Sequence, residues 1–302
     1  MRALALNVKH DLIGLGGVVE RNVYLTRRYI WWDLAFFVWT VANTLTIVFI
    51  AKGIEASGGE IDVERATTTL LIGAVVWAYL GIIFEFITET VAWERWEGTI
   101  EYTFMAPLSR AMHLGGSGVF AVLYGLVRAS LLFVVVAMFF GLAMPDANFT
   151  AALAILLFIV VAAFFGLAFD DANFTAALVI LIVASVSFFG IGMMTAVLPL
   201  ISPEKGAQLG FVAQGMLLVV SGVYYPVEVL PGWMQWLAKI SPATYALDGI
   251  RAAILDGASL GSLWHDIWPL LVIGAACIPL GLLIFGRGEI YAKRHGKLKR
   301  SG

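Results

Sequence analysis

Long uninterrupted apolar runs, separated by short polar stretches, dominate the pattern of this chain. A helix that crosses the hydrocarbon core of a membrane needs about 20 mostly apolar residues. Six stretches meet or nearly meet this length, and a seventh follows a more polar segment: 29–51, 66–87, 117–143, 151–169, 174–200, 207–225 and 267–285. The runs do not alternate apolar with polar residues, which disfavours a membrane β-barrel. The pattern therefore predicts an all-α integral membrane protein with about six transmembrane helices.

The composition agrees with a membrane protein and excludes several other classes. The 302 residues are 61% hydrophobic and 13% charged, whereas soluble domains carry roughly 25% charged residues. A formal net charge of −2 offers no basic footprint for a nucleic-acid partner. The single cysteine, Cys277, excludes a disulfide framework and a cysteine-based zinc site. We expect no metal site in this chain.

The distribution of lysine and arginine predicts the orientation of one membrane domain, 29–286. Residues 1–28 carry five basic side chains, and the tail 287–302 carries six with one acid, Glu289. Because cytoplasmic loops are enriched in these residues, both termini are predicted to be cytoplasmic, in the cell membrane. The acidic loop at 52–65 is then external and the loop at 88–116 internal. Residues 12–28 mix apolar with charged positions and favour an interfacial helix, with a solvated leader as the alternative.

A tandem duplication complicates the count of crossings. Residues 139–153 recur at 164–178 with two differences and an offset of 25 residues, which adds the apolar block 151–169. Between the internal loop and the internal tail the number of crossings must be even, yet five candidates lie between them. We expect 151–169 to dip into the membrane and return. The alternative is that this block crosses and that the loop at 202–208 is external.

The internal segment 93–110 carries the pattern of a short surface helix. Gly98 breaks the preceding helix, and Pro107 stops the next one. The spacing between them allows about two turns, with Ile100, Phe104 and Met105 on or near one face. Such a helix at the membrane surface suits docking to a soluble partner, whereas the alternative is an ordinary loop.

The segment 221–251 predicts a helical hairpin that enters the external leaflet part-way. Glycine and prolines interrupt the chain, aromatic residues favour the interface, and Ser241 is placed to cap a helix that begins at Pro242. Asp248 and Arg251 are spaced to pair on that helix. The positions that define the hairpin are Gly222, Tyr225, Pro226, Pro231, Trp233, Ser241, Pro242, Tyr245, Asp248 and Arg251.

These two segments carry a family resemblance. The inner stretch from Glu97-Gly98-Thr99-Ile100-Glu101 to Pro107-Leu108-Ser109-Arg110, and the outer stretch with Tyr225-Pro226 and Ser241-Pro242, resemble the motifs of type-2 ABC exporter permeases. That family includes drug, polysaccharide and lipid exporters. The resemblance implies a six-span subunit with both termini inside, which pairs with a second permease and with separate ATPase subunits.

The resemblance also implies which residues couple to the ATPase. The candidates are Glu97, Gly98, Thr99, Glu101, Met105, Pro107 and Arg110. The chain has no Gly-x-x-x-x-Gly-Lys-Ser/Thr phosphate loop. ATP and Mg²⁺ are therefore expected on the partner, and the chain itself is expected to be a transport subunit and not an enzyme.

Three polar residues in the apolar runs are candidates for the translocation path. Arg128 lies well inside 117–143, Gln214 inside 207–225, and Glu85 near the end of 66–87. Ionisable groups at membrane depth are costly and usually functional. For Arg128 and Gln214 a structural partner is an equal alternative, whereas for Glu85 the alternative is that its side chain snorkels to water. Glu85 is also a candidate partner of Arg128. The expected cargo is hydrophobic or amphipathic: drug, lipid or glycan-like.

Two other functions compete with the exporter hypothesis. An ion-coupled secondary transporter needs buried carboxylates at mid-membrane, and those positions are nearly free of them. A rhomboid-like serine protease is suggested by Gly115-Gly116-Ser117-Gly118, but it needs a histidine base at membrane depth. Small residues at the start of a helix explain that motif equally well.

Overall fold

The computed structural model describes residues 2–56, 63–139, 173–202 and 205–298. The helices in these ranges are α1 (Arg2–Arg28), α2 (Ile30–Ala56), α3 (Val63–Glu97), α4 (Ile100–Met105), α5 (Arg110–Phe139), α8 (Phe174–Thr195), α9 (Val197–Ile201), α10 (Gly206–Val220), α11 (Gly232–Ala238), α12 (Pro242–Leu255) and α13 (Trp264–Arg294). A 3-10 turn, Val227–Val229, precedes α11. Within these ranges the structure contains no strand.

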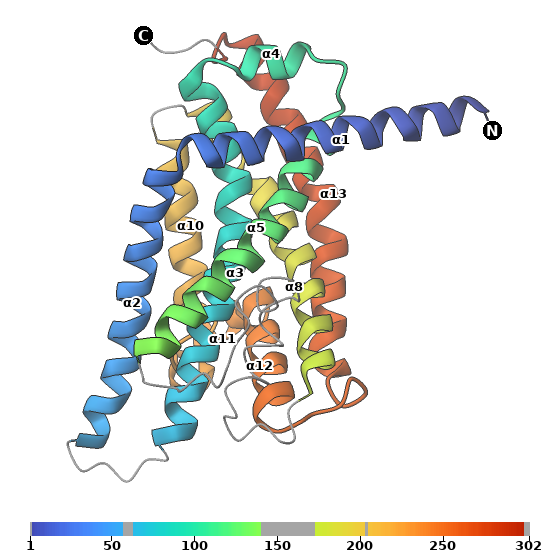
Figure 1. Ribbon diagram of the computed structural model, residues 1–302. Coiled ribbons are helices and arrows are strands. Elements are labelled where there is room, and N and C mark those ends of the chain that lie inside the picture. The colour runs from blue at the N-terminus through green and yellow to red at the C-terminus, as the bar shows by residue number, and fades with distance from the viewer. Residues whose placement is uncertain (1, 57–62, 140–172, 203–204, 299–302) are drawn as a thin grey trace.

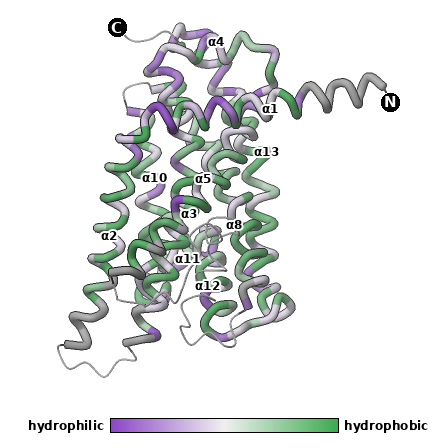
Figure 2. Tube along the Cα trace, in the orientation of Figure 1, coloured by the Kyte–Doolittle hydropathy of each residue, from purple (hydrophilic) through white to green (hydrophobic). Residues whose placement is uncertain are grey.

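The described helices form an upright bundle (Figure 1). Five segments are long and apolar enough to cross a membrane: α2, α3, α5, the continuous run of α8 with α9, and α13. The 15-residue helix α10 is shorter but also apolar. Hydrophobic residues run along these helices, and hydrophilic residues gather on α4 and on part of α1 (Figure 2). The prediction of an all-α integral membrane protein is confirmed, and the described residues contain five candidate spans beside the shorter helix α10.

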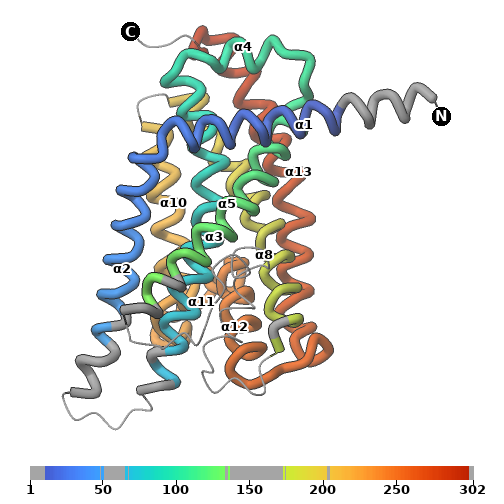
Figure 3. Tube along the Cα trace, viewed as in Figure 1, coloured from blue at the N-terminus to red at the C-terminus, as the bar shows by residue number. Residues whose placement is uncertain are grey.

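The direction of the helices alternates along the chain (Figure 3). The helix α2 leaves the end of the bundle where α4 lies, and α13 returns to that end. The turn after α9 is also at that end, because Lys297 Nζ donates to the carbonyl of Ile201 at 3.0 Å. The alternative that places the turn opposite the tail is therefore wrong. The block 151–169 lies outside the described residues.

The core lies where α3, α8, α12 and α13 meet. Fully buried side chains such as Phe84, Phe188 and Ile250 fill it. Helices α8 and α13 approach closely because Gly190 has no side chain: a Cβ there would lie 2.6 Å from the Cβ of Cys277. Small residues at such crossings let helix backbones pack tightly in membranes.

The helix α1 lies across the bundle at the α4 end (Figure 1). It contains the segment 12–28, for which the sequence favours an interfacial helix. It is not a detached leader, because Val18 is buried and packs over Gly116 of α5. Leu12, Ile13 and Val23 remain exposed. Insertion of this face into a lipid surface stays a prediction.

Candidate functional site

The predicted break at Gly98 produces the turn between α3 and α4. Gly98 adopts a positive φ of 76°, a left-handed conformation that glycine accepts without steric cost. Its N–H donates to the carbonyl of Arg95 at 3.1 Å, and the Thr99 N–H donates to that of Glu94 at 2.8 Å. The chain thus leaves α3 through a compact, fully bonded turn and enters α4.

Helix α4 has one buried face and one exposed face. Ile100 and Phe104 are buried, as the spacing predicts. Met105 is 71% exposed and Tyr102 73%, and Glu101 is also exposed, so Met105 does not share the buried face. The helix ends there because Ala106 is extended before Pro107, the conformation that proline favours in the preceding residue. The exposed face therefore offers an acid, a phenol and a thioether at one end of the bundle.

Arg110 holds α4 to the bundle through bonds within the protein, and it is not part of the exposed face of α4. Its Nε and Nη2 donate to the two carboxylate oxygens of Glu289 in α13, at 2.8 and 2.9 Å. Nη2 also donates to the carbonyl of Phe104 at 2.9 Å. Lys293 Nζ donates to Glu289 at 2.6 Å. The sequence offered one signal for Glu289, since it is the single acid in a basic tail.

The remaining coupling candidates also divide by role. Glu97 accepts a hydrogen bond of 2.7 Å from the hydroxyl of Tyr29, and this bond raises the pKa of that phenol. The Thr99 hydroxyl donates to the Glu94 carbonyl at 3.3 Å. Pro107 is exposed beside Met105. Of the seven candidates, Glu101, Met105 and Pro107 lie outward, while Glu97, Thr99 and Arg110 bond within the molecule and Gly98 shapes the turn.

The structure brings the three path candidates into one region between α2, α3, α5 and α10. Arg128 forms its ion pair with Asp33, at 3.0 Å, and not with Glu85 as the sequence suggested. The hydroxyl of Tyr124 also donates to Asp33. Gln214 of α10 lies over Gly81 of α3, close enough to Glu85 to interact with it.

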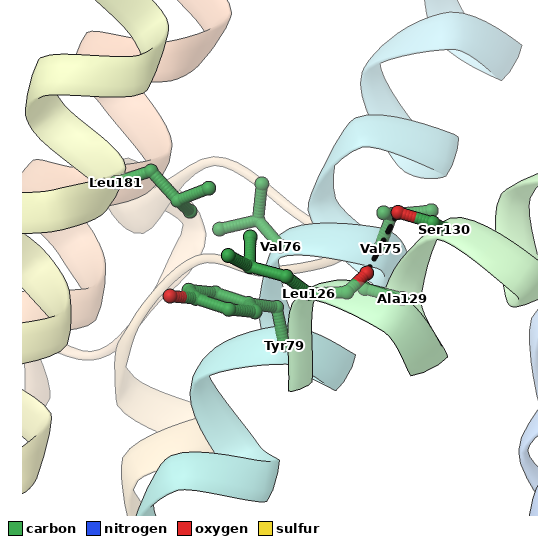
Figure 4. A pocket seen from close by; sticks show the side chains of 7 residues that line it. All are labelled: Val75, Val76, Tyr79, Leu126, Ala129, Ser130 and Leu181. Carbon is green, nitrogen blue, oxygen red and sulfur yellow. Dashed lines mark hydrogen bonds between the residues drawn. The ribbon is translucent and has the colours of Figure 1, made fainter. Parts of the chain in front are cut away.

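A small pocket between α3, α5 and α8 is a poor substrate site. Its lining residues are Val75, Val76, Tyr79, Leu126, Ala129, Ser130 and Leu181 (Figure 4). Its two hydroxyls are already bonded: Tyr79 Oη lies 2.7 Å from Ser185 Oγ, and Ser130 donates to the carbonyl of Leu126. The pocket therefore offers apolar contacts without a free polar anchor.

The predicted hairpin forms at the opposite end from α4 (Figure 1). Helix α12 is buried against α3, α8 and α13. Arg251 does not form the predicted ion pair with Asp248: its guanidinium donates to the carbonyls of Gly222 and Val223, at 3.0 and 2.7 Å. These bonds satisfy carbonyls at the end of α10 that no helix turn reaches.

Serine and aromatic positions complete this hairpin. Ser241 stands at the N-cap position of α12, but its hydroxyl bonds Ser221 at 2.7 Å instead of capping the helix. The hydroxyl of Tyr245 donates to the carbonyl of Lys239. Trp233 and Trp236 are exposed, as expected for rings at a membrane interface.

The Gly115–Gly118 motif is a helix-crossing site. A Cβ on Gly116 would lie 2.7 Å from Val18 of α1, and one on Gly118 would lie 2.3 Å from the ring of Phe189 of α8. Ser117 is buried and accepts a hydrogen bond from the amide of Asn22 at 3.4 Å. These contacts explain Gly116 and Gly118 without a catalytic serine, whereas a Cβ on Gly115 would meet nothing within 4 Å.

Comparisons with known proteins agree with this architecture. Residues 149–255 match the ABC-2 type transporter family. The "Probable multidrug ABC transporter permease YbhR" of Escherichia coli (strain K12) is 28% identical over 199 residues, which are 66% of this chain and 46% of that protein. The "Linearmycin resistance permease protein LnrN" of Bacillus subtilis (strain 168) is 30% identical over 93 residues, 31% of this chain and 24% of that protein.

A third relative is "ABC transporter G family member 20" of Dictyostelium discoideum, 29% identical over 90 residues, 30% of this chain and 12% of that protein. The matched part of this chain spans slightly less than half, 46%, of the length of the E. coli relative. The family description and the E. coli and Dictyostelium relatives name ABC transporters, the Bacillus relative is named as a permease, and the described fold is a bundle of apolar helices. Over residues 149–255 the chain is therefore similar to permeases of the ABC-2 type.

Proposed function

We propose that this permease is the membrane subunit of an ATP-driven exporter, and that the exposed face of α4 docks a separate ATPase subunit. One observation carries the proposal: α4 presents Glu101, Tyr102 and Met105 outward while its other face is buried in the bundle. In this proposal the α4 end and both termini are cytoplasmic. A second permease subunit completes the translocation path, and ATP and Mg²⁺ bind the partner.

The attachments of α4 supply a route for mechanical work. The Gly98 turn joins α4 to α3, and Arg110 joins it to Glu289 of α13. Packed helices respond to a local push by moving as rigid elements. Closure of the ATPase on ATP would therefore displace α3 and α13 together and alter access to the path.

We further propose a hydrophobic or amphipathic cargo. The names of two relatives refer to multidrug transport and to linearmycin resistance. In this chain the helix surfaces are mainly apolar, and the polar points among them include Arg128 with Asp33, and Glu85 with Gln214. Such a lining favours apolar cargo that carries a polar group.

The test of α4 docking is Glu101→Lys, with Glu228→Lys as the matched control. Both glutamates are exposed, and Glu228 lies at the opposite end of the bundle. We expect Glu101→Lys to weaken association with the ATPase roughly tenfold, because a rim charge of the wrong sign opposes docking. The measurement is the amount of ATPase subunit that co-purifies with each variant, together with ATP hydrolysis in proteoliposomes. Equal recovery with Glu101→Lys and with the wild type would refute the docking assignment.

A further inference from the structure

A buried polar cluster joins three helices beside the α4 turn. Glu94, near the end of α3, is only 3% exposed. One of its carboxylate oxygens, Oε1, accepts a hydrogen bond from Arg21 of α1 and lies 2.9 Å from Nε2 of His113 of α5. The charge on Glu94 is therefore neutralised by a helix that lies across the bundle, and not by a neighbour on its own helix.

The backbone of the same residue holds the start of α4. The carbonyl of Glu94 accepts the Thr99 N–H at 2.8 Å and the Thr99 hydroxyl at 3.3 Å. One turn further along α3, Glu97 accepts from the Tyr29 hydroxyl at the corner between α1 and α2. The last turn of α3 is thus bonded to the α1–α2 corner through side chains and to α4 through its backbone.

The attachment of α1 at this point is tight. Val18 packs over Gly116 at a distance that leaves no room for a Cβ. The amide of Asn22 donates to the buried hydroxyl of Ser117, one turn beyond His113 on α5. The opposite side of α1 exposes Leu12, Ile13 and Val23. The helix therefore has one face fixed to the α3–α5 junction and an apolar face open to its surroundings.

We propose that Glu94 is a positioning residue that makes α1 and α4 move as one unit. Through it, the position of α1 at the membrane surface sets the position of the helix that docks the ATPase. The second statement rests on the proposed function of α4, whereas the first concerns only this chain.

The proposal that α1 and α4 move as one unit is tested by the distance between spin labels on these two helices. Cys277 is the single cysteine, so Cys277→Ala gives a clean background for Tyr24→Cys and Tyr102→Cys, both at exposed positions. Pulsed electron paramagnetic resonance on the reconstituted permease should give one narrow distance distribution. Arg21→Gln and Glu94→Gln should each broaden it. Arg65→Gln, which breaks an exposed ion pair with Asp256 at the other end, should leave it narrow.

The proposal that α1 sets the position of the docking helix α4 is tested in proteoliposomes that also contain the ATPase. Glu94→Gln and Arg21→Gln should retain the bound ATPase but lower the substrate moved per ATP hydrolysed by roughly fivefold. Glu94→Asp keeps the charge and should restore most of that ratio. A purely structural role of Glu94 would lower protein yield and ATPase binding together. The amount of substrate moved per ATP hydrolysed would then stay constant.

The outcomes separate this inference from the proposed function. An unchanged distance distribution in both Arg21→Gln and Glu94→Gln would overturn the joint between α1 and α4. A broadened distribution with an unchanged transport ratio would overturn its role in coupling. Failure of the wild-type permease to bind an ATPase would refute α4 docking and with it the coupling role, while the spin-label measurement still decides the joint. Arg21 is partly exposed, so its variant remains informative if Glu94→Gln does not fold.

Discussion

Several charged side chains in this protein are held in ion pairs that join two helices. Arg128 pairs with Asp33, Arg110 with Glu289, and Arg21 with Glu94. An isolated charge in the membrane costs at least a few kcal/mol, and removal of one partner from a buried pair is strongly destabilising. Each pair therefore fixes the mutual position of two helices.

Replacement of Glu289 by glutamine is predicted to loosen α4. The change leaves Arg110 and Lys293 without their shared carboxylate, and hydrogen bonds to charged groups contribute about 1.5–3 kcal/mol. We expect a lower unfolding temperature in detergent and weaker ATPase association. Glu20→Gln, an exposed change on α1, serves as the control. Identical thermal unfolding of the two variants would argue against the anchoring role.

At this scale the sequence identified the unusual residues but not their partners. Arg128 stands out in an apolar run, yet Asp33 lies 95 positions away, and only the packing of α2 on α5 brings them together. The same reason explains why Arg251 was wrongly paired with Asp248. A spacing of three residues permits an ion pair, but the free carbonyls at the end of α10 are nearer partners in the fold.

The elements of this molecule are defined by local breakers and by small residues at crossings. The ends of α4, and the starts of α11 and α12, follow from Gly98, Pro107, Pro231 and Pro242, so the sequence predicts them well. The contact of α8 with α13 depends instead on where Gly190 meets Cys277, which needs the three-dimensional arrangement. Breakers act on their neighbours in the chain, whereas crossings depend on distant residues.

Two glycine substitutions distinguish a crossing from an open helix surface. Gly190→Ala places a Cβ 2.9 Å from the backbone of Cys277 and should destabilise the bundle by about 1–3 kcal/mol. Gly215→Ala on α10 meets nothing within 4 Å, so it should be neutral or slightly stabilising through helix propensity. Thermal unfolding of both variants in the same detergent gives the comparison. A loss of stability in Gly215→Ala equal to that in Gly190→Ala would contradict this packing.

For the whole molecule, the structure places α4 and the hairpin at opposite ends of the bundle (Figure 1). The sequence predicted both features and an even number of crossings, but five candidate runs after α4 left the parity open. The bond from Lys297 to the carbonyl of Ile201 resolves the position of the turn after α9. Apolar runs show where helices lie, and a contact between distant segments shows which end each one reaches.

Labelling of single cysteines tests this arrangement in cells. In the Cys277→Ala background, Trp236→Cys should react with a membrane-impermeant maleimide added outside, and Tyr102→Cys should react only after the cells are opened. Both positions are well exposed, so access to the reagent decides the result. The expected order follows from the predicted cytoplasmic location of the basic termini. Labelling of both sites from outside would contradict opposite ends.

The end of α5 and the start of α8 both lie at the hairpin end of the bundle (Figure 3). Helix α8 therefore runs back through the bundle in the direction opposite to α5, and the later helices follow from that direction. An insertion that starts and finishes on one side of a membrane leaves the later helices facing as before, whereas an insertion that crosses would turn them inside out.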